Sequence, residues 1–140
     1  MPNWLRLILA IVVGLLIGSL VNGGLISISG QFIPPPPGSD LTTEEGLTAA
    51  MSQMGPQHFL FPFLAHALGT LVGAFIATKI APASNWIPAI VIGIVFLAGG
   101  AYMVKILPAP LWFEALDLIV AYLPAALLGY VFAKPRRALN

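Results

Sequence analysis

The chain has 140 residues, of which 59% are hydrophobic and 8% are charged, whereas about 25% of the residues in a soluble domain are charged. The length fits one compact unit, so we expect a single transmembrane domain over residues 1–140. The chain contains no cysteine, which excludes disulfides, thiol redox chemistry and Cys-ligated metals. The formal net charge of +1 says little as a total, but the positions of the charges are informative.

Four apolar stretches are long enough to cross a membrane. A helix rises about 1.5 Å per residue, so about 20 residues cross a hydrocarbon core of ~30 Å. The runs predict spans at about 4–26, 59–80, 86–107 and 111–132. The fold class that follows is all-α: a membrane four-helix bundle.

The end of the first span is open to two interpretations. The glycine pair at 23–24 could end the helix, or the helix could continue through the following apolar run to about Ile33. We favour continuation, because backbone groups in lipid must find their hydrogen bonds inside the helix. Four prolines at 34–37 then end any helix.

An extracytoplasmic loop is expected over about 34–57. Thr42 followed by Glu45 has the capping-box pattern of a helix start, and Leu47 and Met51 fall on one face of the helix that would follow. These features predict a short amphipathic helix on the membrane surface or over the mouth of the bundle.

Two local signals concern the last two spans. Ser84 or Asn85 is expected to cap the start of the third span. Pro124 lies inside the fourth span and leaves the carbonyl of Val120 without its helical donor, so we expect a kink or a polar contact there.

Small residues four apart form stripes on the first two spans. Gly14 and Gly18 lie on the first span, and Gly69 and Gly73 lie on the second. Such stripes let helix backbones approach closely in lipid, where water provides no hydrophobic driving force. They predict sites of helix packing.

The charges predict the orientation. If the N-terminus is cytoplasmic, five of the six basic residues face the cytoplasm and all five acidic residues lie outside or near the outer face, as the positive-inside rule requires. The five basic residues are Arg6, Lys79, Lys134, Arg136 and Arg137, and only Lys105 breaks the pattern. We therefore expect a multi-pass membrane protein with both termini in the cytoplasm.

Polar residues gather in the outer half of the predicted bundle. Ionisable groups inside a span are costly and are candidates for function. The cluster comprises His66, Asp117, Glu114, Lys105, Asn22 and His58.

One interpretation of this cluster is structural. Lys105 could pair with Glu114 or Asp117 across the short turn and tie the third span to the fourth, while His66 holds the second span through a carbonyl or carboxylate. The other interpretation is a path for protons or a solute, because histidine changes charge near neutral pH. The inner half is nearly purely apolar, so one protomer offers no path across the membrane.

The sequence offers little support for a metal site or a catalytic site. His58 and His66 are eight residues apart, which is poor geometry for one ion, and no nucleophile accompanies the carboxylates. The three basic charges near the C-terminus are too few for useful nucleic-acid affinity. We expect no metal, no cofactor, no enzymatic activity and no nucleic-acid partner.

Three runs carry a resemblance: HFLFPFLAHALGT, the loop with PPPP, and LPAPLWFEALDL. They resemble a family of small four-span inner-membrane proteins of bacteria with no known activity, and the resemblance implies location and architecture only. The small multidrug transporters also have four short spans, but they rely on a carboxylate in the first span, which this chain lacks.

The sequence favours a non-enzymatic integral membrane protein that acts through helix–helix association, as an accessory or structural subunit or as a homo-oligomer. Its partners would be membrane lipid and either a second copy or another membrane protein. The alternative is a small transporter or channel that uses the outer His and carboxylate residues for proton or cation coupling.

Overall fold

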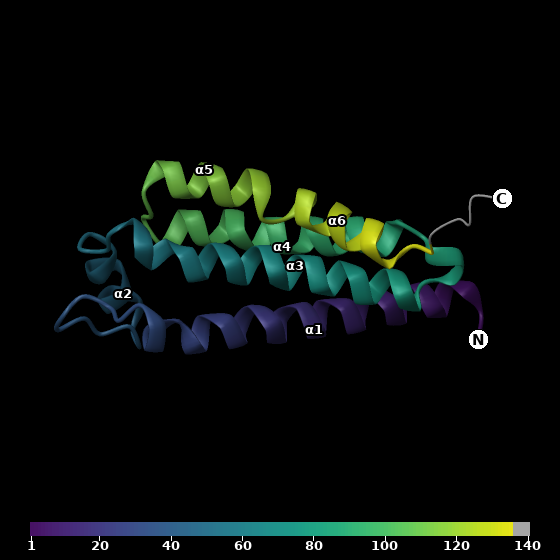
Figure 1. The fold of residues 1–140 in the computed structure, drawn as a ribbon, viewed down its shortest axis with the longest axis horizontal. Coiled ribbons are helices and arrows are strands. Elements are labelled where there is room, and N and C mark those ends of the chain that lie inside the picture. The colour runs from purple at the N-terminus through teal and green to yellow at the C-terminus, as the bar shows by residue number, and fades with distance from the viewer. Residues whose placement is uncertain (136–140) are drawn as a thin grey trace.

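The computed structural model describes residues 1–135, and within that range it is helical and has no β-strand, which confirms the all-α prediction. Four helical segments have the length and composition to cross a membrane: Asn3–Phe32, Pro56–Ile80, Ile87–Ile106 and Leu111–Ala133. They run antiparallel in sequence order, so α1 begins and α6 ends at the same end of the bundle (Figure 1).

Helix α1 (Asn3–Phe32) passes through the glycine pair without a break and ends where the prolines begin, as the favoured interpretation predicted. Its 30 residues rise about 45 Å, which is more than a ~30 Å hydrocarbon core. Part of α1 must therefore tilt or project beyond the core. Its last turns lie beside the loop and α2 (Glu44–Met51) (Figure 1).

The glycine stripes of α1 and α3 (Leu60–Ile80) face each other within one chain. A Cβ atom on Gly14 would lie 2.7 Å from the carbonyl oxygen of Gly73, and one on Gly18 would lie 2.7 Å from that of Gly69. Backbones this close leave no room for side chains. The stripes that the sequence offered for association therefore pack against each other.

The opposite face of α3 packs against α4 (Ile87–Ile106) and α6 (Leu123–Ala133). Ala74, Ala89 and Ala126 form a fully buried cluster there, and Ala10 and Ala77 form a second cluster beneath α1. Small side chains thus fill the inner half of the bundle at close range.

The fourth span is two helices, α5 (Leu111–Val120) and α6, as Pro124 led us to expect. The chain leaves helical geometry at Tyr122, whose φ of −112° and ψ of −81° separate them. Pro124 then occupies the first turn of α6, where a missing N–H is tolerated.

The predicted surface helix exists as α2, but its predicted cap was wrong by one residue. The hydroxyl of Thr43 accepts the Gly46 N–H at 3.1 Å, whereas Thr42 donates to Oδ1 of Asp40 at 2.6 Å. The hydroxyl and the backbone N–H of Thr42 both donate to the Asp40 carboxylate. They lower the pKa of Asp40, because both bonds favour the ionised carboxylate.

Two short 3-10 turns, η1 (Pro56–Phe59) and η2 (Pro82–Ser84), complete the connections. Helix α4 starts as expected near Asn85, whose side-chain oxygen accepts the Ile87 N–H at 2.9 Å.

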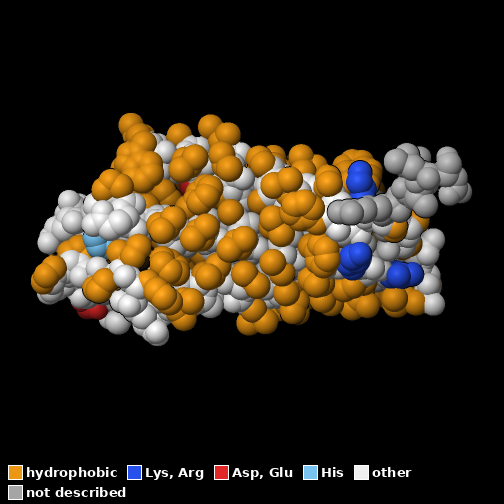
Figure 2. All heavy atoms as spheres, in the orientation of Figure 1, with side chains coloured by type: hydrophobic (Ala, Val, Ile, Leu, Met, Phe, Trp, Pro, Cys, Tyr) orange, Lys and Arg blue, Asp and Glu red, His pale blue; other side chains and the backbone are white. Residues whose placement is uncertain are grey.

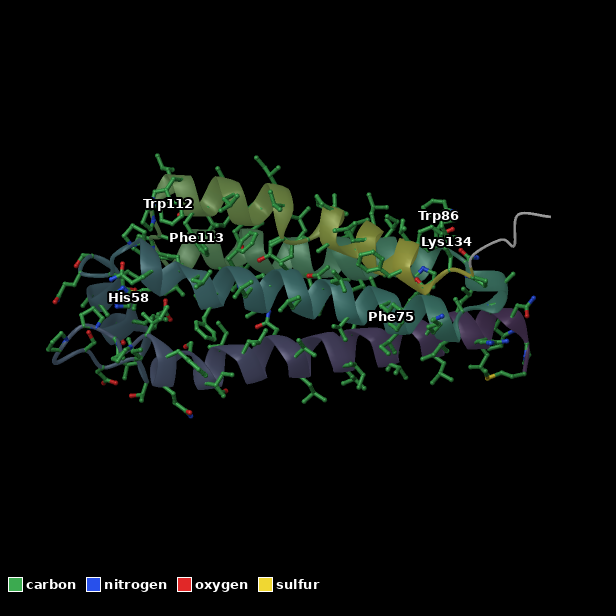
Figure 3. The ribbon with its side chains drawn as sticks, viewed as in Figure 1. His58, Phe75, Trp86, Trp112, Phe113 and Lys134 are labelled. Atoms are coloured by element: carbon green, nitrogen blue, oxygen red, sulfur yellow. The ribbon has the colours of Figure 1, made fainter. Side chains whose placement is uncertain are left out.

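The charges separate between the two ends of the molecule. Arg6 near the start of α1, Lys79 in the last turn of α3 and Lys134 after α6 lie at the end where α1 begins, whereas Lys105 in the last turn of α4 lies at the other end. Basic side chains gather at the first of these ends, and hydrophobic side chains cover much of the visible flank (Figure 2). Trp86 and Lys134 lie at that end, while Trp112 lies at the other (Figure 3). We call the Trp112 end outer and the Lys134 end inner. The predicted basic residues Arg136 and Arg137 lie outside the described residues.

Candidate binding site in the outer half

The structure joins His66 of α3 to Asp117 of α5. The Nδ1 atom of His66 lies 2.9 Å from both carboxylate oxygens of Asp117. The Asp117 residue is 4% exposed, so its carboxylate depends on protein partners rather than on water. Two residues 51 positions apart in the chain thus form one polar pair inside an apolar bundle.

Tyr122 completes the group. Its hydroxyl donates to Oδ2 of Asp117 at 2.8 Å, and its ring stacks on the His66 ring with centroids 5.6 Å apart. The break between α5 and α6 turns the ring toward α4, where Gly100 makes room: a Cβ there would lie 2.6 Å from the Tyr122 ring. The contact between Tyr122 and Asp117 was not predicted. The sequence feature that indicates it is Pro124, which lies two residues after the break at Tyr122.

The hydrogen bonds determine which nitrogen of His66 is free. An ionised Asp117 can only accept, so Nδ1 of His66 carries the proton and donates. In the neutral ring Nε2 is then an acceptor, and no described residue lies within hydrogen-bonding distance of it. The Thr70 hydroxyl donates to the His66 carbonyl at 2.7 Å, within α3.

This group borders a cavity of about 650 Å³ in the outer half of the bundle. The cavity wall is mostly apolar and includes Asn22, Ile26 and Gly30 from α1 and Phe96, Gly99 and Met103 from α4. Leu47 and Met51 of α2 line it as well. The surface helix thus contributes to the wall through the apolar face that the sequence predicted.

The cavity does not continue into the inner half. Its wall takes residues from α1 only from Asn22 onward, from α3 only as far as His66, and from α4 only from Phe96 onward. Below this level α1 and α4 meet, since a Cβ on Gly18 would lie 2.9 Å from the Phe96 ring. The cavity is therefore a pocket that ends near the middle of the bundle.

The other predicted site residues divide into two groups. Asn22 and Glu114 line the cavity, and Asn22 lies near the level of His66, since a Cβ on Gly69 would lie 3.0 Å from the Asn22 Cβ. Lys105 is exposed and does not line the cavity. Within residues 1–135 it makes no ion pair, so the predicted tie between Lys105 and Glu114 or Asp117 is not formed. Asp117 turns toward α3 instead.

His58 borders the cavity but serves the loop. The Gly55 N–H donates to Nδ1 of His58 at 3.1 Å, which leaves Nε2–H of the neutral ring to donate to the Pro34 carbonyl at 3.1 Å. The side chain thereby links the end of α1 to the start of the second span (Figure 3). It belongs to the rim and not to the His66 group.

The chemistry available is binding and proton exchange at His66. In the part of the chain that the structure describes, no three His, Asp or Glu side chains gather in a way that could hold a metal ion. The carboxylate of Asp117 fixes the orientation of His66, and the free Nε2 atom can accept a hydrogen bond or a proton from a molecule in the cavity. The chain matches no protein-family model, no curated protein and no solved structure.

Proposed function

We propose that this chain is a non-enzymatic integral membrane protein that binds a small amphiphile in its outer-half cavity. The observation that carries the proposal is the cavity itself: about 650 Å³, apolar along its walls, with the His66 group on its border. Pockets of roughly 300–1,000 Å³ with a few convergent polar groups are typical of small-molecule sites.

The route of entry follows from the helix contacts. Helices α1 and α4 touch near Gly18 and Phe96, and beyond that level both line the cavity. Two residues of the cavity wall, Gly30 of α1 and Gly99 of α4, have no side chain, and a Cβ on either would meet no atom within 4 Å. An amphiphile dissolved in the outer leaflet would enter between these helices, with its head group toward His66.

Transport, the alternative from the sequence, would use the same cavity as an outward-facing site. The packing of the inner half argues against an open channel, because glycine and alanine contacts close the bundle below Phe96. A carrier would have to separate α1 from α3 at the glycine stripes, where even a Cβ on Gly14 or Gly18 would lie only 2.7 Å from a carbonyl oxygen of α3. Binding requires no such movement and is the function that the geometry supports better.

Association with another membrane protein is the second candidate. The stripes that suggested it are already used between α1 and α3. What favours it now is the glycine pair Gly23 and Gly24, which is exposed on α1 and has open space at both Cβ positions. A helix of a second copy or of another protein could approach closely there.

The proposed location is the bacterial inner membrane with both termini in the cytoplasm. The supporting observation is the distribution of charge: Arg6, Lys79 and Lys134 lie at the inner end and the acidic α2 lies at the outer end, and among the described basic residues only Lys105 departs from this pattern. The sequence resemblance to small four-span inner-membrane proteins of bacteria agrees with this location.

The test fills the cavity without disturbing the helix contacts. Gly99→Leu adds a side chain at a residue of the cavity wall, and Gly24→Leu adds the same side chain at a residue outside that wall; neither new Cβ would meet an atom within 4 Å. Dodecylamine and dodecanol are titrated into each protein in lipid nanodiscs while thermal unfolding is followed. We expect at least one of them to stabilise the parent and Gly24→Leu but not Gly99→Leu. An equal response of all three proteins would show that the probes act through the bilayer, and the proposal would fail.

A further inference from the structure

We infer that the cavity selects amphiphiles whose head group is a protonated amine. The inference rests on the proposed function and names the class of ligand. Two carboxylates, Glu114 and Asp117, line the cavity, and no lysine or arginine of the described residues does. A cationic head group would therefore enter a site of opposite charge, and an anionic one would meet two carboxylates without a counter-charge.

The polar groups on the cavity wall include hydrogen-bond acceptors, which suit the donors of a protonated amine. The Nε2 atom of neutral His66 accepts, the Glu114 carboxylate accepts, and the amide of Asn22 offers an oxygen. Asp117 is already occupied by His66 and Tyr122, so it contributes its charge from behind the imidazole. An ammonium group carries three donors and no acceptor, which is the complement of this set.

The apolar part of the ligand would lie against the cavity wall formed by α1 and α4. Ile26 of α1 and Met103 of α4 line the cavity, as do Gly30 and Gly99, whose Cβ positions are open. A hydrocarbon chain would lie between α1 and α4 with its end toward the lipid, while the amine stays near His66. This arrangement distinguishes an amphiphile from a simple inorganic cation, which would gain nothing from the apolar wall.

The experiment compares three head groups on one hydrocarbon chain. Dodecylamine, dodecanol and dodecanoate are titrated into the full protein in nanodiscs of zwitterionic lipid, and each Kd is taken from the concentration dependence of thermal stabilisation. We expect the amine to bind at least about ten-fold more tightly than the alcohol, with the carboxylate weakest. Glu114→Gln should reduce this preference, whereas Glu44→Gln, which removes a carboxylate of α2 outside the cavity wall, should not.

The outcomes separate this inference from the proposed function. If dodecanol binds as tightly as dodecylamine and Gly99→Leu abolishes both, the cavity binds amphiphiles but the amine class is wrong. Tightest binding of dodecanoate would overturn the class as well. If Gly99→Leu binds all three probes like the parent, the proposed function itself fails.

Discussion

Replacing Gly14 by alanine tests the contact on which the bundle depends. The added Cβ would lie 2.7 Å from the Gly73 carbonyl oxygen and 2.8 Å from the Ala77 Cβ, and it would also contact the end of the Ile92 side chain. Ordinary contacts begin at 3.4 Å, so α1 and α3 must separate locally by 3.4 − 2.7 = 0.7 Å. Neither a carbonyl oxygen nor a Cβ can rotate away, and overpacking of this kind typically costs about 1–3 kcal/mol.

The matched control is Gly24→Ala, in the same helix, where the new Cβ meets no atom within 4 Å. Alanine is favoured over glycine in a helix by up to about 1 kcal/mol, and this gain is common to both variants. The difference between their unfolding free energies therefore isolates the steric cost, which we expect to be about 1–3 kcal/mol. Unfolding in mixed detergent, followed by circular dichroism, measures it. Equal stability of the two variants would refute the close α1–α3 contact.

Three further predictions concern the loop and the topology. Cysteines introduced at Ser39 and Asn140 should react with an impermeant thiol reagent from opposite sides of the membrane, Ser39 from outside, and labelling of both from one side would contradict the predicted orientation. His58→Phe removes the link to the polyproline segment, so amide hydrogen exchange over 38–43 should accelerate, and unchanged exchange would mean that the link does not hold the loop. Thr42→Val should raise the pKa of Asp40 toward its ordinary value in a carboxylate NMR titration. The parent loop keeps this hydrogen-bond stabilisation above the ordinary carboxyl pKa and loses it as the pH falls through the lowered value, so the variant should lose order at a higher pH.

Helix positions could be predicted from the sequence because apolar length is a direct constraint in lipid. The third span was expected over 86–107 and is Ile87–Ile106. The continuation of α1 past residues 23–24 followed from the same constraint, since an interrupted backbone would leave its polar groups without partners in lipid. Only the surface-helix cap was misplaced, because Thr42 and Thr43 are chemically equivalent in the sequence.

The rotation of each helix could not be predicted in the same way. In a soluble protein the buried face is marked by its contrast with a polar face, whereas in these spans both the buried and the lipid-facing sides are apolar. No pattern in the sequence indicates that Asp117 pairs with His66 of α3 and not with Lys105 of α4. The contact between Tyr122 and Asp117 could not be predicted, because residues five apart do not share a helix face and only the break before Pro124 brings the hydroxyl to the carboxylate.

The two possible partners of Asp117 can be distinguished by comparing coupling energies. Asp117→Leu leaves the His66 ring and the Tyr122 hydroxyl without an acceptor, and loss of one partner of a buried pair costs up to about 3–5 kcal/mol. The cost here should be smaller, because the His66 side chain is 24% exposed and water can replace part of the interaction.

A second change identifies the partner. Adding His66→Leu to Asp117→Leu should recover part of the loss, with a coupling energy between about 0.5 and 3 kcal/mol, because the two side chains are in contact. Adding Lys105→Met should give additive effects within about 0.5 kcal/mol, because Lys105 is exposed and unpaired within residues 1–135. Unfolding free energies of the single and double variants provide both values. If Lys105 couples to Asp117 more strongly than His66 does, the structural tie expected from the sequence is correct, and the His66 group does not form in the membrane.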